Sequence, residues 1–510
     1  MDSSPPTPAL PAVRQRRWLA LGALALAFVA YAVLLGYHMG AYAGGSDSSG
    51  YLNNARLLRK GLVHVPRRTI DGLSPETLSA YAYVPLGFSP VGQRDMVPTY
   101  PIGLSLLMVA LSPITGASAA PHAVMWLHAL LGIILMFALA RLAGLSLTAT
   151  TLGALLLGAC PLYLYISLQA MSDTPALVWT TAAVYFAWRS QRAAPWALAA
   201  GVSVAVAVLV RPTNLLILAP VAVCLGFAWR RWLGLALGGA PGAVLLGVFN
   251  HALYGKILTT GYGDVGSAFS LKFAPLSLGN YIQWLPVLLT PGLLLALAAP
   301  WAMPRGQRRF LAVLASWILA YVGFYTFYYH THETWWYLRF VLPAFPAIIL
   351  AMLFTGRAIA ARWPARAAGA TAVLIAVGVL GWDGWWARHF HALDSGRGEA
   401  VYPQAITWAR AHLPPNAVIA AMQTSGALLY YSNFTFIRWD TLSENKFATV
   451  AAACTASGRP FYAMLLPFEI EDQGALARMP GRWTQVGTVD NRYGHVTMFK
   501  WEPPPPAEAR

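Results

Sequence analysis

Charged residues are scarce in this chain. Asp, Glu, Lys and Arg together make up 11% of its 510 residues, whereas soluble domains carry roughly 25%. Because 57% of the residues are hydrophobic, a soluble core could not bury them all, and lipid must cover part of the surface. The scarcity of charge therefore excludes an ordinary soluble protein and predicts a polytopic α-helical membrane protein.

Acidic residues are the scarcer kind, 19 against 35 basic ones. The basic residues form short clusters between apolar segments, as cytoplasmic loops do. The chain has no lysine-rich arm and no interleaving of basic with aromatic residues, so we expect no nucleic-acid partner. Cysteine is also rare: Cys160 and Cys224 lie in apolar segments, and Cys454 stands alone in the C-terminal region, which excludes an internal disulfide there.

About eleven apolar segments are predicted to cross the membrane. The first follows Arg14, Arg16 and Arg17 and has no small-residue cleavage site, so we expect an uncleaved helix rather than a signal peptide. With a cytoplasmic N-terminus, every basic cluster between the segments falls on the cytoplasmic side. The segments are 18–37, 121–141, 147–168, 174–190, 196–210, 213–229, 232–253, 281–300, 310–328, 339–356 and 368–385.

The apolar segment 100–116 is too short to join this set. It runs for only about 13 residues before Pro113, and a spanning helix needs roughly 20. We therefore expect a re-entrant or juxtamembrane helix on the outer side. The first loop (38–120), the loops 254–280 and 329–338, and the C-terminal region then lie outside the cytoplasm.

The C-terminal region, 386–500, is polar enough to be a separate domain. The segment "AITWARAHLP" has helical spacing, and "NAVIAAM" is a strand candidate followed by the apolar segments "GALLYYS" and "FTFIRW". Further strand candidates, "RPFYAMLLPF" and "GRWTQVGTVDNRYGHVTMFKW", flank the helix candidate "QGALARM". Helices alternating with strands predict an extracytoplasmic α/β domain. We expect residues 1–17 to be a cytoplasmic tail, 18–385 the transmembrane domain and 501–510 a disordered tail.

Two acids stand out at helix starts. Asp47 follows the first apolar segment in "GGSDSSGYLNN", with Tyr51 four residues on, and Asp173 opens a helix in "QAMSDTPALVW". An acid or serine before proline is also an ordinary helix N-cap. For Asp173, a capping role and a chemical role both remain open.

Cations gather on the same predicted side. Arg211, in "LVRPTN", departs from the positive-inside pattern at the outer membrane face. Its guanidinium suits a lipid phosphate, although simple snorkelling remains an alternative. Lys256 adds a second outward cation near the membrane.

The loop "YYHTHETWWYLRF" contains His332, Glu333 and Arg339 among aromatic residues. Two histidines and a glutamate raise a divalent metal site as an alternative, but this spacing is a weaker signature than H-E-x-x-H on a helix. An interfacial aromatic belt explains the tryptophans equally well. Ionisable residues at a membrane surface are candidate functional groups: carboxylates with aromatic rings suit sugars, and cations beside an apolar groove suit a lipid phosphate.

The order of these motifs resembles the GT-C membrane glycosyltransferases, the class that includes protein O-mannosyltransferases and bacterial aminoarabinose transferases. The matching pieces, across residues 18–385, are "SDSSGY", "TYPIGLSLLMVALSPITG", "MSDTPALVW", "LVRPTNLLILAP" and "YLRFVLPAFPAIIL". The resemblance implies catalytic roles for Asp47 and Asp173. The implied substrate or lipid-phosphate contacts are Tyr51, Tyr100, Arg211, Lys256, His332, Glu333 and Arg339.

Two departures from the family pattern concern these contacts. Ser48 follows Asp47 where many members carry a second acid, and Tyr100 stands where some carry a lysine. Phosphate binding would then fall to the other cations. The need for a divalent metal stays open, because the class contains both metal-dependent and metal-independent branches.

The predicted activity is inverting transfer of a sugar from a polyprenyl-phosphate donor to an acceptor hydroxyl, with Asp47 as general base. The acceptor would be a glycan, lipid or protein, on the outer face of the cell inner (plasma) membrane. A secondary transporter is an alternative, although the chain shows no inverted repeat. A non-catalytic envelope assembly protein is the other, and it predicts that changes at Asp47 and Asp173 are tolerated.

Overall fold

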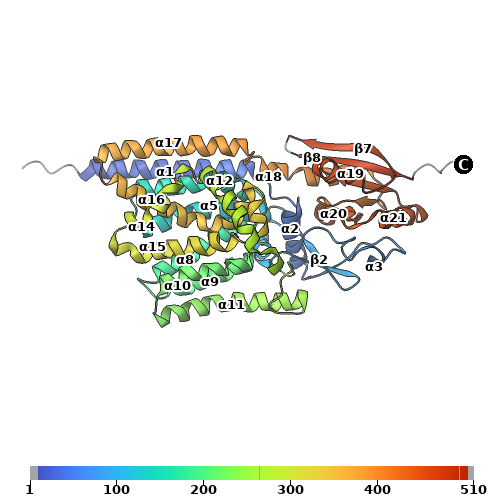
Figure 1. The fold of residues 1–510 in the computed structure, drawn as a ribbon, viewed down its shortest axis with the longest axis horizontal. Coiled ribbons are helices and arrows are strands. Elements are labelled where there is room, and N and C mark those ends of the chain that lie inside the picture. Colours follow the sequence, from blue (N-terminus) through green and yellow to red (C-terminus); the bar gives the residue numbers. More distant parts are fainter. Residues whose placement is uncertain (1–9, 264, 493, 504–510) are drawn as a thin grey trace, which may run out of the picture.

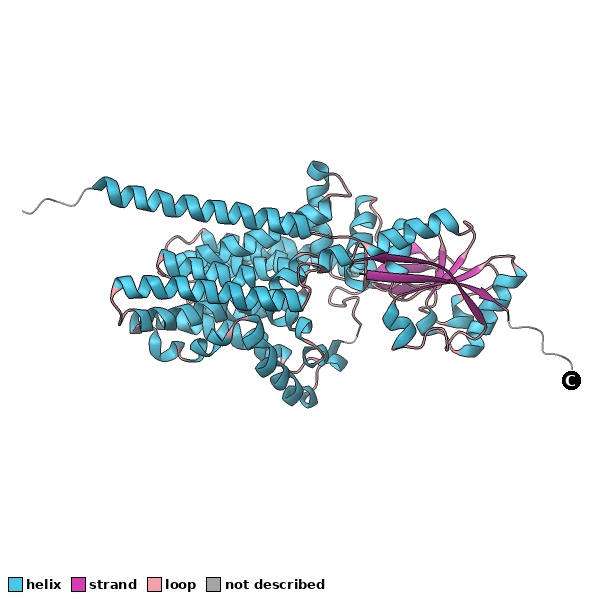
Figure 2. Cartoon of the chain, turned by 90° about the horizontal axis from the view of Figure 1, so that it is seen from above, coloured by secondary structure: helices cyan, strands magenta, loops and turns pink. Residues whose placement is uncertain are grey.

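Two parts make up the structure, a computed structural model that describes residues 10–263, 265–492 and 494–503. A helical part occupies one end and a domain containing a five-stranded sheet occupies the other (Figure 1). Figure 2 shows the strands gathered beyond the ends of the long helices. The helix α2 (Ser46–Arg59) lies where the two parts meet, because it packs on both α4 (Ile102–Thr115) and α20 (Ser425–Tyr431).

Five helical stretches of the described residues are long and apolar enough to cross a membrane, and the count rises to seven if each of two bent helix pairs is one span. The expected multi-pass helical architecture is thus present, but the predicted count of eleven spans is not confirmed. Four of the stretches belong to α1 (Leu10–His38), α5 (Ala120–Leu142), α11 (Trp229–Tyr254) and α17 (Ala365–His389). The fifth consists of the 3-10 helix η8 (Trp335–Ala344) and the helix α16 (Phe345–Ala360), which follow one another without a break.

Proline breaks two of the predicted spans. The segment 147–168 divides into α6 (Leu147–Ala159) and α7 (Pro161–Ser167), which meet at 58°. Cys160 takes an extended conformation there, as a residue before proline does. The segment 281–300 bends by 114° after α12 (Ala274–Leu288), where Thr290 has φ of 64° and Pro291 follows. The predicted span 281–300 is thus divided between two helical pieces rather than formed by one continuous helix.

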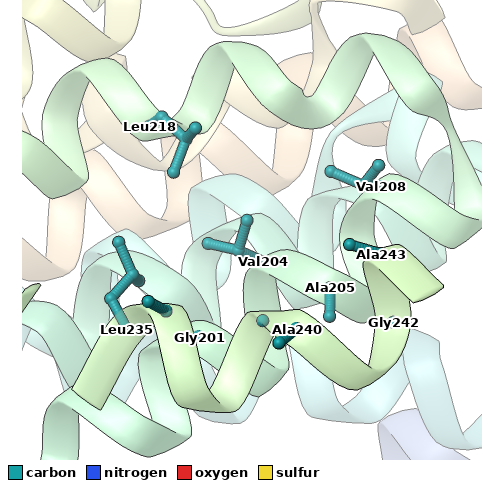
Figure 3. A pocket seen from close by; sticks show the side chains of 11 residues that line it. Gly201, Val204, Ala205, Val208, Leu218, Leu235, Ala240, Gly242 and Ala243 are labelled. Carbon is teal, nitrogen blue, oxygen red and sulfur yellow. The ribbon is translucent and has the colours of Figure 1, made fainter. Parts of the chain in front are cut away.

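The remaining helices of the helical part are shorter. The arginine before Pro212 ends α9 (Trp196–Val210), and a 3-10 turn η1 (Pro212–Ile217) leads into α10 (Leu218–Leu225). An apolar pocket of about 330 Å³ lies between α9, α10 and α11, and its lining side chains carry only carbon (Figure 3). The others are α8 (Asp173–Arg189), α13 (Leu294–Leu297), α14 (Ala299–Ala302) and α15 (Arg308–Ile318).

The first loop is ordered by a small sheet and by α4. Its strands β1 (Val65–Pro66), β3 (Asp95–Pro98) and β2 (Phe88–Val91) pair antiparallel in that order, and α3 (Pro75–Leu78) lies between them in sequence. The helix α4 is 14 residues long and ends at Thr115, and the next residue, Gly116, has φ of 80°. It is the short apolar helix that the sequence predicts, packed on α2, α5 and α9.

The C-terminal domain is α/β, with strand order β5-β4-β6-β8-β7. The strand β4 (Val418–Ala420) pairs parallel with β5 (Thr435–Ile437) and β6 (Phe461–Leu465), and β8 (Gly494–Glu502) pairs antiparallel with β6 and β7 (Arg482–Asn491). The predicted strand regions "NAVIAAM", "RPFYAMLLPF" and "GRWTQVGTVDNRYGHVTMFKW" are present. Of the two apolar segments after the first of them, "FTFIRW" forms β5, whereas "GALLYYS" forms the helix α20. The helices are α18 (Ser395–Gly398), α19 (Val401–His412), α20, α21 (Glu444–Ala456) and α22 (Pro467–Glu471).

Two details of this domain differ from the prediction. The segment "QGALARM" forms turns rather than a helix, because Gly474 adopts φ of 61° and Pro480 follows. Trp501 and Glu502 end β8 instead of starting a disordered tail, and residues 504–510 lie outside the described residues, as do residues 1–9 of the predicted N-terminal tail.

Candidate functional site

A cavity of about 820 Å³ lies where the helical part meets α2 and the C-terminal domain. The cavity is lined by residues of α2, α7 and η8. Its other lining residues precede α4, follow α7, α9 and α11, lie within 325–330 or follow α17. The charged and polar members that matter below are Ser46, Asp47, Ser48, Tyr51, Tyr100, Tyr165, Gln169, Arg211, Thr213, Tyr262, Tyr325, Tyr337, Arg339, Glu399 and Gln423.

Two arginines and two aspartates form an ion-pair chain at this cavity. Arg339 Nη1 lies 2.7 Å from Asp47 Oδ2 and 3.9 Å from Asp173 Oδ2. Arg211 Nη1 lies 2.8 Å from Asp173 Oδ1. Buried charges are tolerated when they are paired, and the Asp173 side chain is 1% exposed. The chain of charges is neutral overall and presents Asp47, the most exposed member at 24%, to the cavity.

Local structure places Asp47 in the first turn of α2, where the helix dipole favours an acid. Ser46 and Tyr100 share a hydrogen bond of 2.8 Å between their hydroxyls. Burial alone would raise the pKa of Asp47, but the charge of Arg339 and a hydrogen bond from Tyr100 hold that pKa below its usual value. Asp47 is therefore an ionised carboxylate at neutral pH.

The start of α8 does not use its polar residues as a conventional cap. Ser172 occupies the N-cap position without capping the helix by its side chain, and its hydroxyl oxygen accepts a hydrogen bond of 2.9 Å from Arg211 Nε. Arg211 is extended because Pro212 follows it. Its side chain is 13% exposed, so it is paired inside the protein and does not snorkel toward lipid.

Aromatic rings form one wall beside the two guanidinium groups. The ring of Phe340 lies 5.0 Å from Arg211 Cζ and 5.2 Å from Arg339 Cζ. Trp336 and Tyr337 also face Arg339, at 5.4 and 5.7 Å. Such contacts hold a guanidinium in place without neutralising its charge.

Five of the predicted site residues line the cavity, namely Asp47, Tyr51, Tyr100, Arg211 and Arg339. Asp173 lies directly behind them, bound to both arginines. The structure thus brings six residues together from five separate sequence motifs.

Three predicted contacts lie apart from the cavity lining. Lys256 is exposed on the loop after α11. His332 stacks on Phe273 at 5.4 Å, and Glu333 pairs with His330 at 3.0 Å. Across residues 10–263, 265–492 and 494–503, no three His, Cys, Asp or Glu side chains are grouped to hold a metal ion.

Sequence reasoning missed several lining residues, and Glu399 is the most informative. Its carboxylate Oε2 accepts hydrogen bonds from Ser48 Oγ at 2.6 Å and from the Gly45 amide at 3.3 Å. Burial raises the pKa of Glu399 to about 7 despite these two bonds, and the charge of Asp47 adds to the rise. The available signal was its position, an acid shortly after the last apolar segment of an acid-poor chain.

The structure combines a helical membrane part, an acid-bearing helix α2 after the first long helix and a C-terminal α/β domain. Solved structures share this fold and confirm the resemblance read from the motifs. ArnT from Cupriavidus metallidurans, solved bound to undecaprenyl phosphate, is 15% identical with a TM-score of 0.55, over 94% of this chain and 98% of that one.

Two larger proteins match with similar scores. The Archaeoglobus fulgidus oligosaccharyltransferase is 13% identical with a TM-score of 0.51, over 88% of this chain and 70% of that one. The arabinofuranosyltransferase AftD from Mycobacteria is 14% identical with a TM-score of 0.53, over 95% of this chain and 40% of that one.

A family model gives an independent match to part of the chain. The model for dolichyl-phosphate-mannose-protein mannosyltransferase matches residues 118–257, which include Asp173 and Arg211. No curated protein matches the chain by sequence.

Proposed function

We propose that this protein is a membrane glycosyltransferase that moves a sugar from a polyprenyl-phosphate donor to an acceptor hydroxyl. The observation that carries the proposal is the ion pair of Arg339 with Asp47 in the cavity. It provides a carboxylate and a cation in contact, inside a fold shared with a protein solved bound to undecaprenyl phosphate.

The proposed reaction is a single displacement. The acceptor oxygen forms a bond to the anomeric carbon as the bond from that carbon to the phosphate oxygen breaks, which inverts the configuration. The polyprenyl phosphate leaves with the bonding electron pair, and the acceptor proton passes to Asp47. Because the pKa of Asp47 is lowered, this proton transfer occurs late, when the attacking hydroxyl has become acidic.

Arg339 couples these two events. While Asp47 is ionised, the guanidinium is neutralised by it at 2.7 Å. When Asp47 takes the proton, that pairing weakens at the moment when the departing phosphate gains charge. Arg339, with Arg211 beside Asp173, then stabilises the developing anion. The aspartate and the arginine thus exchange partners during the displacement.

The proposed location follows from the distribution of charge. Basic clusters between the apolar segments favour a cytoplasmic N-terminus, which puts α2, the cavity and the C-terminal domain on the outer side of the cell inner membrane. A lipid-linked donor fits this side, since nucleotide sugars are cytoplasmic. Residues 47 and 399 replaced by cysteine would then be labelled by impermeant reagents from outside.

Incubation of the purified protein with a set of polyprenyl-phosphate sugars tests the activity. We expect release of the polyprenyl-phosphate carrier from at least one donor in the wild type, and none from Asp47→Asn. No release from any donor by folded protein would refute the proposal. Solute flux into liposomes without consumption of a lipid-linked sugar would instead support a transporter.

A further inference from the structure

Two side chains from beyond the last long helix enter the cavity. Glu399 directly follows α18, and Gln423 lies in the loop between β4 and α20. They come from a part of the chain that lies outside the five motifs of the transmembrane domain. The C-terminal region thus supplies part of the cavity wall.

Both side chains are held against the start of α2. Glu399 uses Oε2 for its bonds to Ser48 and Gly45, and within the described residues no hydrogen bond reaches its Oε1. A Cβ atom at Gly45 would lie 2.8 Å from Gln423 Nε2, and one at Gly44 would lie 1.9 Å from Glu399 Oε2. Because Gly44 and Gly45 have no side chains, Glu399 and Gln423 can lie directly against the backbone before Asp47.

The side chains that line the cavity around Glu399 limit which acceptors could bind there. The two arginines of the lining are already paired with Asp47 and Asp173. Around Glu399 the lining supplies a carboxyl group, the Gln423 amide, serine hydroxyls and tyrosine rings. These groups donate to and accept from sugar hydroxyls, and the rings pack on apolar sugar faces. An anionic acceptor on this side would lie close to carboxyl groups, and both arginines of the lining already pair with aspartates.

We propose that Glu399 and Gln423 form the acceptor-binding side of the cavity and that the acceptor is a neutral carbohydrate. This inference rests on the proposed glycosyl transfer and specifies its second substrate. Glu399 binds an acceptor hydroxyl through Oε1 while Ser48 and Gly45 fix Oε2. Gln423 binds a neighbouring hydroxyl, and the attacking hydroxyl then faces Asp47, the residue next to Ser48.

The test compares acceptors that differ only in charge. The purified wild type, supplied with the donor from which it releases carrier, is given neutral p-nitrophenyl hexosides and the matching anionic p-nitrophenyl hexuronides. We expect kcat/KM for a neutral hexoside to be about 10-fold or more above that for the matching hexuronide. The reason is that the hexuronide carboxylate would be buried without a partner or repelled by the carboxyl groups of the cavity. Equal or better use of hexuronides would overturn the inference, as would transfer to peptide acceptors alone.

Variants then separate acceptor binding from donor binding. Glu399→Gln and Gln423→Ala should each raise KM for the neutral hexoside about 10-fold, the effect of one lost hydrogen bond to a bound substrate. KM for the donor and binding of undecaprenyl phosphate should stay within about 2-fold, since the arginines are untouched. The exposed Glu471→Gln and Gln473→Ala changes in the same domain are matched controls and should leave both KM values unaltered.

The outcomes distinguish this inference from the proposed function. If both variants release carrier and their KM for the acceptor is unchanged, the assignment of Glu399 and Gln423 to acceptor binding is refuted, and the proposed glycosyltransferase activity is not. An equal loss of undecaprenyl phosphate binding in both variants also refutes it, because the residues would then only support α2. Absence of carrier release from every donor refutes the glycosyltransferase itself, and this inference with it.

Discussion

Arg339 Nη1 lies 2.7 Å from Asp47 Oδ2, and this ion pair joins the helix that follows the first span to the 3-10 helix that precedes α16. The same nitrogen lies 3.9 Å from Asp173. One guanidinium thus fixes the position of two carboxylates from distant parts of the chain. The pair with Asp47 faces the cavity, whereas the pair with Asp173 is buried, so the two aspartates should respond differently to substitution.

Replacing Asp47 by Asn should remove activity without unfolding the protein. Loss of a general base lowers the rate about 100- to 10,000-fold. The side chain is 24% exposed, so solvent can compensate part of the lost ion pair. Carrier release and thermal unfolding in detergent measure the two effects. Near-normal transfer by Asp47→Asn would contradict the assignment of the base.

Replacing Asp173 by Asn should instead destabilise the fold. The change leaves the buried guanidinium of Arg211 without its carboxylate at 2.8 Å, and removing one partner of a buried ion pair costs about 3–5 kcal/mol. Thermal unfolding in detergent measures the loss. Asp95→Asn is the matched control, because Asp95 is 40% exposed and lies 3.6 Å from His64. Equal shifts in the two variants would show that the Asp173 pair contributes no special stability.

The sequence predicted the residues whose charge was conspicuous and missed those whose role depends on distant contacts. Asp173 stood out because it opens a helix and Arg211 because it departs from the positive-inside pattern, and they pair in the structure. The composition of the loop with His332 and Glu333 gave no indication of which way its side chains point. Glu399 acquires its role only when the chain beyond α17 returns to the start of α2, which no local pattern encodes.

The bend near Thr290 illustrates the same limit for the fold. The apolar composition of residues 281–300 fits a membrane span, and a hydropathy calculation detects composition but not a bend. The left-handed conformation of Thr290 and the following Pro291 turn the chain by 114° between the two helices. A threonine rarely adopts a positive φ, so the residue type gives no indication of the bend. Length and apolarity therefore predict a span at residues 281–300 but not its bend.

Glu399 should make the stability of the protein fall as the pH rises. Its pKa is about 7 in the folded state against a usual 4.5, so its contribution is present below pH 4.5 and is lost as the pH rises through about 7. The titratable groups that face it are Asp47, Tyr165, Tyr402 and Tyr431. The pKa values of Tyr402 and Tyr431 are raised by burial, so these two side chains stay neutral across this window, and Asp47 stays ionised.

The midpoint of thermal unfolding, measured from pH 4.5 to 8 for the wild type and Glu399→Gln, checks this dependence. We expect the wild type to lose stability relative to the variant between pH 4.5 and 7, since glutamine cannot ionise. Above pH 8 the difference should be constant. Parallel curves for the two proteins throughout the range would contradict the raised pKa.

Gly396 should be needed for the close packing of α18 that places Glu399 at the cavity. It belongs to α18, three residues before Glu399, and its neighbours are backbone atoms. A Cβ atom there would lie 2.4 Å from the Leu168 carbonyl oxygen and 2.6 Å from both the Gly40 nitrogen and the His38 carbonyl oxygen. Backbone cannot move aside as a side chain can, so Gly396→Ala must displace α18 from α7 and from the end of α1.

Such overpacking costs typically about 1–3 kcal/mol, and the displacement should also move Glu399 away from Ser48. We therefore expect Gly396→Ala to lower the midpoint of thermal unfolding and to raise acceptor KM together. Gly384→Ala is the matched control, because a Cβ atom there has no neighbour within 4 Å and alanine favours the surrounding helix α17. A stable Gly396→Ala protein with wild-type acceptor KM would mean that α18 does not position Glu399, since no alanine could be accommodated there without moving the backbone that carries it.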